Sequence, residues 1–92
     1  MFPELIRILE NEFLPKWEDT QETLIFDEIE EFSIQARMQG AEYGCALLIS
    51  WSDTVMKQMR QFDMENLSAT FEKFPELIKK IRIIAENKET SS

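Results

Sequence analysis

Apolar residues recur at spacings of three and four along most of this 92-residue chain, in four successive segments. Such spacing places side chains on one face of an α-helix. Each amphipathic helix needs a neighbour against which to bury its apolar face, so we expect an all-α, up-and-down four-helix bundle. The stripe positions are Phe2, Leu5, Ile6, Leu9, Phe13 and Trp17; Ile25, Ile29, Phe32, Ala36 and Tyr43; Cys45, Leu48, Ser52, Val55, Met59 and Phe62; and Met64, Leu67, Phe71, Phe74, Ile78, Ile81 and Ala85.

Helix-breaking and capping residues predict where these helices begin and end. Pro15 should kink or interrupt the first helix, which then continues towards Thr23. Asp27 is expected to open the second helix, and Gly44 to separate it from the third. A short turn at residues 61–63 makes the third and fourth helices antiparallel neighbours, with Asp63 as the cap of the fourth.

Pro75 leaves two interpretations of the last segment open. It either kinks one long final helix or begins a short fifth helix. No Ser-, Gly- or Pro-rich linker divides the chain, and its length suits one hydrophobic core. We therefore expect a single domain over residues 1–88, followed by a disordered tail at residues 89–92.

The net charge of −8 arises in the first third of the chain. Residues 1–31 contain ten acidic and two basic side chains, whereas residues 32–92 contain eight of each. Such a surface repels phosphate backbones and anionic lipid, so we expect neither nucleic-acid nor membrane binding. Its acidic face either serves only solubility or steers a basic partner. No apolar run approaches the ~18 residues of a membrane span, and we expect a cytoplasmic domain.

The residues needed for most catalytic and metal sites are missing from the sequence. The chain contains no histidine, which excludes Ser-His and Cys-His couples and the Glu-x-x-His pairs of di-iron bundles. Glu28 with Glu31, or Glu18 with Glu22, could pair carboxylates on one helix face, but such clusters usually face solvent. Cys45, the only cysteine, is expected to be buried. We predict no metal, no cofactor and no catalysis.

The second helix carries an apolar strip on the side away from its core stripe. Counting 100° per residue from Ile29, Ile34 lies at about 140°, Met38 at about 180° and Ala41 at about 120°. Two interpretations follow. The first helix covers Ile34 and Met38, or the strip is exposed and docks on a partner with Glu30, Glu31 and Arg37 at its polar rim. Gly40, on the core side, should let another helix approach closely.

The segment Ser33 to Gly44 also resembles a known motif. In the histidine-containing phosphotransfer family the motif reads His-x-x-Lys-Gly-Ser, followed after a few residues by Leu-Gly. Aligning Leu-Gly with Tyr43-Gly44 places the histidine at Ile34, the lysine at Arg37 and the glycine at Met38. From about Leu5 to Ile84 the chain resembles the phosphotransfer-like domain at the C-terminus of bacterial hybrid sensor histidine kinases. The resemblance is closest to a divergent branch that lacks the phosphoacceptor.

The resemblance implies a non-catalytic signalling module of a two-component system. Ile34 has no nitrogen that could accept phosphate, so the module would bind a receiver domain, or pack within its own kinase, without phosphotransfer. The docking strip comprises Ile34, Arg37, Met38 and Ala41, with Glu30 and Glu31 at its rim. The alternative is a structural bundle that forms a homodimer or a larger homo-oligomer through the same surface.

Overall fold

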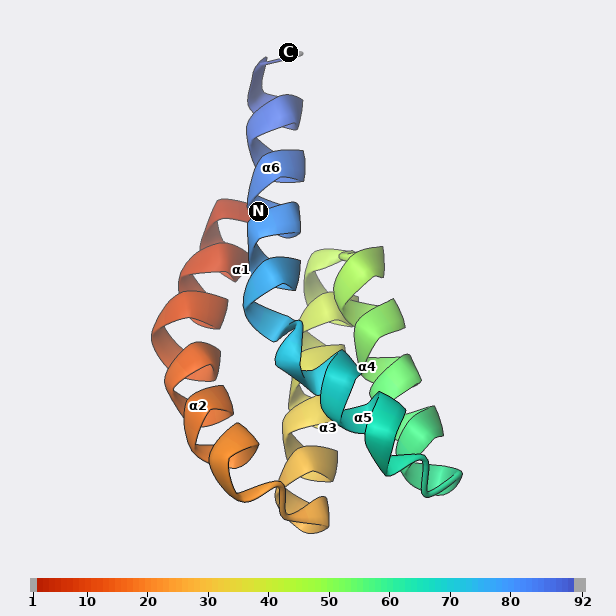
Figure 1. Ribbon diagram of the computed structural model, residues 1–92. Coiled ribbons are helices and arrows are strands. Elements are labelled where there is room, and N and C mark those ends of the chain that lie inside the picture. Colours follow the sequence, from red (N-terminus) through yellow and green to blue (C-terminus); the bar gives the residue numbers. More distant parts are fainter. Residues whose placement is uncertain (1, 91–92) are drawn as a thin grey trace.

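The computed structural model describes residues 2–90, with side chains for residues 2–86, and this part of the chain is helical without a strand. The first three elements, α1, the π-helical η1 and α2, form one continuous rod (Figure 1). The described chain therefore has five helices, which confirms the all-α class but not the expected count of four. The elements are α1 (Phe2–Ile8), η1 (Leu9–Phe13), α2 (Leu14–Thr23), α3 (Phe26–Tyr43), α4 (Ala46–Arg60), α5 (Met64–Glu72) and α6 (Phe74–Thr90).

The central element is α3, which lies between the α1–α2 rod and α4 (Figure 1). The longest helix contact joins α3 to the antiparallel α4, and α5 then packs along α4. After a bend, α6 turns to run alongside α1 and extends beyond it. The Arg82 guanidinium forms an ion pair with Glu10 of η1 and links the first and last parts of the chain.

Pro15 produces a π-helical turn rather than a break. A proline inside a helix removes one N–H donor, and its ring collides with the carbonyl four residues earlier. The wider turn of η1, in which the Leu14 N–H donates to the Leu9 carbonyl, immediately precedes it and leaves Pro15 at the start of α2. The rod continues to Thr23, as the apolar spacing predicts.

Pro75 separates α5 from α6 at Lys73. In a continuous helix the Phe71 carbonyl would accept from the N–H of residue 75, but proline has none. The indole of Trp17 replaces that donor: its Nε1 lies 2.8 Å from the Phe71 oxygen. Of the two interpretations of Pro75, the structure therefore shows a fifth helix, and at 17 residues it is long rather than short.

A second indole binds the same end of α5. Trp51 Nε1 of α4 lies 2.9 Å from the Thr70 oxygen, which also accepts from the Lys73 N–H at 3.2 Å. The last turn of a helix leaves carbonyls without intrahelical partners. The indoles of α2 and α4 thus hold the C-terminus of α5 from two sides.

Aromatic rings fill the centre of the core around Phe32. Its ring meets Phe71, Phe74 and Trp51 edge-on, with centroids 5.5, 5.1 and 6.1 Å away. Edge-to-face contacts at these distances are favourable beyond the area they bury. Most of the predicted stripes are buried, Cys45 among them at 2% exposure.

Gly40 brings α3 and α4 into close contact, as predicted. A Cβ placed on Gly40 would lie 2.9 Å from Ile49 Cγ1 and 3.1 Å from the Ile49 backbone nitrogen. Gly40 therefore allows the α3 and α4 backbones to approach each other.

Three stripe positions that we predicted to be buried are exposed: Ile25 by 51%, Phe62 by 75% and Met64 by 46%. Each lies at a helix terminus or in a turn, where the backbone leaves the helical path.

Two helix boundaries also differ from prediction. α3 begins at Phe26, one residue before Asp27, and α6 extends to Thr90, past the start of the expected tail at residue 89. Residues 91–92 of that tail lie outside the described residues. Asp63 caps α5, as predicted, by accepting from the Asn66 N–H.

We expect Trp17→Phe to destabilise the protein more than Trp51→Phe. Both variants lose part of a ring, but the first removes a buried hydrogen bond, from Trp17 to the Phe71 carbonyl, whereas the bond from Trp51 is only partly buried. Losing the buried bond costs about 1–3 kcal/mol. The Thr70 carbonyl keeps the Lys73 N–H. Urea denaturation followed by circular dichroism measures the difference, and equal losses would contradict the role given to Trp17.

Gly40→Ala should lower the free energy of unfolding by up to about 2 kcal/mol. Overpacking costs about 1–3 kcal/mol, and the higher helix propensity of alanine returns about 1 kcal/mol. The double variant Gly40→Ala/Ile49→Ala removes the atom that lies 2.9 Å away, so the two effects should not add. Additive losses in a double-mutant cycle would show that Gly40 does not set the spacing of α3 and α4.

Candidate functional site

The apolar strip on α3 is open to solvent. Ile34 is 43% exposed and Met38 is 58% exposed. Both lie on the middle turns of the helix, on the side away from Phe32 and Ala36, which are fully buried. The first helix therefore does not cover them, which removes one of the two interpretations of the strip.

Ile34 lies in a groove between α3 and the C-terminal half of α4. Phe26, Glu30 and Ile34 follow one another at intervals of four along one wall, so they share a helix face. The groove has a volume of about 450 Å³. Its other residues are Met56, Met59 and Arg60 of α4 and Phe62 of the following turn. It is thus an apolar groove with one acidic and one basic side chain in its walls.

The turn after α4 places Phe62 at the end of this groove. The Phe62 N–H donates to the Met59 carbonyl at 3.1 Å, and the Asp63 N–H donates to the Gln58 carbonyl at 3.0 Å. This pair of bonds is the Schellman motif, in which the residue after the cap has a positive φ. Phe62 has φ 53° and turns its ring out of the core, where it stacks on Phe26 with centroids 6.2 Å apart.

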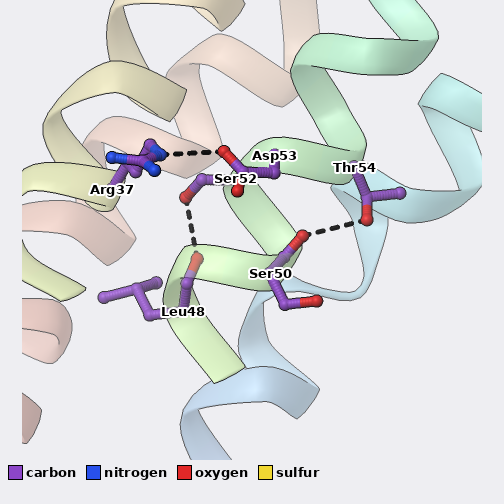
Figure 2. A network of polar contacts seen from close by, with 6 residues as sticks. All are labelled: Arg37, Leu48, Ser50, Ser52, Asp53 and Thr54. Atoms are coloured by element: carbon purple, nitrogen blue, oxygen red, sulfur yellow. Dashed lines mark hydrogen bonds and ion pairs between the residues drawn. The ribbon is translucent and has the colours of Figure 1, made fainter. Parts of the chain in front are cut away.

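Arg37 is engaged with α4 rather than free. Its Nε lies 2.8 Å from Asp53 Oδ1, and the two side chains are 47% and 53% exposed (Figure 2). Next to Asp53, the Ser52 hydroxyl donates to the Leu48 carbonyl of its own helix, and Thr54 does the same with Ser50. An exposed pair of this kind contributes about 0–1 kcal/mol. The Arg37 side chain, which we expected at the rim of a docking strip, therefore bridges α3 and α4.

The structure separates the remaining predicted site residues. Glu30 lies in the groove with Ile34, but Glu31 lies on the opposite side of α3, in a cleft with Glu12 and Lys16. Met38 and Ala41 are exposed further along α3 and do not line the groove. Ile34 and Glu30 are therefore the two predicted residues that share one concave surface.

Sequence reasoning missed Phe26, Met56 and Phe62. Phe26 and Met56 lie outside the predicted stripes, and Phe62 was assigned to the core. The available signal was a large apolar side chain in the short turn at residues 61–63, where glycine suits the backbone better. Which residues of α4 and its turn lie opposite Phe26 depends on the register of the antiparallel α3 and α4. The spacing of apolar residues within one helix does not specify that register.

Clusters of metal ligands and shifted pKa values commonly mark a chemical site. Among the side chains of residues 2–86, no three or more Cys, Asp or Glu gather as metal ligands would. Burial, with smaller contributions from the Glu4 and Glu42 carboxylates, raises the pKa of the Tyr43 phenol above its ordinary value. This hydroxyl therefore stays protonated at neutral pH.

Within the described part of the chain, no helix combines the length and the apolar character that a membrane span needs. Comparisons with models of protein families, with curated proteins and with solved structures found no match for this chain. The residues of the groove and the motif resemblance around Ile34 are therefore the grounds for assigning a function.

Proposed function

We propose that this chain is a phosphotransfer-like module of a two-component sensor kinase that binds a receiver domain without accepting phosphate. The observation that carries the proposal is the position of Ile34. It is exposed on the middle of α3, at the place that the motif resemblance assigns to the phosphoacceptor, and it opens onto an apolar groove. The chain contains no histidine that could take its role.

The helical arrangement supports the same assignment. The α1–α2 rod, α3, α4 and the α5–α6 pair would correspond to the four helices of an up-and-down phosphotransfer bundle, with Pro75 dividing the last of them. In such a bundle the second helix presents the phosphoacceptor side chain to the receiver. Here α3 is that second helix, and the side chain it presents is apolar.

An apolar residue at this position favours binding over chemistry. Burying an isoleucine side chain fully contributes about 1.5–3 kcal/mol. Ile34 retains 43% of its surface for a partner to cover, and the methionines beside it adapt to different surfaces. Glu30 and Arg60 supply the charged rim that interfaces commonly carry.

Ile34→Asp should weaken receiver binding about tenfold or more, because a carboxylate would have to lose its water in the apolar groove. Isothermal titration calorimetry with the receiver domain of the same polypeptide or operon measures the affinity. The matched control is Ile83→Asp, because Ile83 is 55% exposed on α6 and does not line the groove. Equal affinities for the wild type and Ile34→Asp would exclude Ile34 from the interface.

A second experiment, on the free protein, tests the structural alternative of self-association through this surface. Analytical ultracentrifugation of the free protein should show a monomer, because two copies of net charge −8 repel each other. A stable dimer that Ile34→Asp dissociates would favour a homo-oligomeric role over receiver binding.

Incubation with the phosphorylated receiver should leave this protein unlabelled. Phosphohistidine is acid-labile, and the sequence holds no histidine to form it. A phosphotransfer assay with radiolabelled receiver measures this directly, with a histidine-containing phosphotransfer domain as the positive control. An acid-labile label on this chain would contradict the proposed function.

A further inference from the structure

Phe62 combines a backbone strain with an exposed aromatic ring. Its φ of 53° lies in the left-handed region, where the Cβ of an L-residue meets the neighbouring carbonyl oxygen. At the end of α3 the same pair of turn bonds forms around Gly44, at φ 66°, and glycine avoids that strain. Phe62 is nevertheless 75% exposed, so burial in its own core does not offset the strain. Strained residues of this kind often belong to binding surfaces.

The groove next to Phe62 has charges of opposite sign on its two walls. Glu30 lies on the α3 wall and Arg60 on the α4 wall, and neither forms an ion pair within the described residues. Asp27 is also exposed and lies three residues before Glu30, so the two carboxylates are neighbours on the surface of α3. Both walls are therefore available to pair with charges of a partner.

The groove also has the dimensions of a helix-binding surface. Ile34 follows Phe26 by eight residues along α3, with Glu30 midway, which corresponds to about 12 Å of rise. An apolar helix face offers anchors at i, i+3, i+4 and i+7 over a similar length. The stacked rings of Phe26 and Phe62 close one end, where an aromatic anchor is most effective.

We propose that this groove binds one amphipathic helix of the partner, anchored on Phe62, with its basic flank against the Glu30 wall and its acidic flank against the Arg60 wall. The inference rests on the proposed function only in taking the groove as the docking surface. It adds the class of partner segment and the residue on which the segment is anchored.

The test uses three synthetic 18-residue peptides and needs no receiver domain. The first carries leucines at i, i+3, i+4 and i+7 with lysines on one flank and glutamates on the other. The second has glutamates on both flanks, and the third scrambles the first. Titration into ¹⁵N-labelled protein should shift the amide signals of Phe26, Ile34, Met56 and Phe62 with the first peptide. The second should bind about tenfold more weakly and the third should leave these signals in place.

Phe62→Gly and Leu24→Gly form a matched pair of variants. Leu24 also has a positive φ, 51°, and is 37% exposed, but it lies outside the groove. Both substitutions relieve backbone strain, so neither should lower the melting temperature. Only Phe62→Gly should weaken binding of the first peptide, by about tenfold.

The inference is overturned by any of four results. These are no shifts in the groove at millimolar peptide, equal binding of the first two peptides, equal losses in the two glycine variants, and groove signals that shift with protein concentration alone. The last result would assign the groove to a second copy of the chain. A receiver that binds while the peptides fail would leave the proposed function intact and reject only the helix-binding groove. If the peptides bind and the receiver does not, the helix-binding groove is supported and the proposed function is rejected.

Discussion

The hydrogen bond from the Trp17 indole to the Phe71 carbonyl holds the two ends of the fold together. Pro75 removes the N–H that would donate to this carbonyl in a continuous helix, and losing a hydrogen bond to a buried carbonyl is costly. The replacement donor comes from α2, 54 residues away, so this bond links the break between α5 and α6 to the first rod. The same break turns α6 alongside α1, where Arg82 pairs with Glu10.

The close approach of α3 and α4 determines the form of the candidate site. At Gly40 the backbones are near enough that a single methyl group would collide with Ile49. Towards the other end of the pair the side chains are larger, and the groove opens between Ile34 and Met56. The Arg37–Asp53 pair lies between these two regions and bridges the helices at the surface. A tight crossing at one end thus leaves an apolar groove at the other.

The site and the fold place different demands on the turn after α4. Glycine is the most stable residue at a backbone position with positive φ, and Gly44 occupies such a position after α3. At the equivalent position after α4 the chain has Phe62, whose ring is largely exposed to solvent. A partner helix, as proposed above, would cover this ring. With Ile34, it gives the groove two exposed apolar groups that the protein does not bury itself.

The sequence alone predicts the helical class, most of the buried stripes, the position of Ile34 and Met38 opposite the core stripe of their helix, and the capping role of Asp63. These follow from helical periodicity and local hydrogen bonding, which depend on near neighbours in the chain. The packing of the helices accounts for the rest: Pro75 divides the last segment into two helices, and the donor that compensates for it comes from Trp17. Packing also places Glu31 and Glu30 on different surfaces, pairs Arg37 with Asp53, and leaves Ile34 and Met38 exposed. Such relations depend on which helices are neighbours and in what register they pack, and residue spacing within one helix carries no information about either.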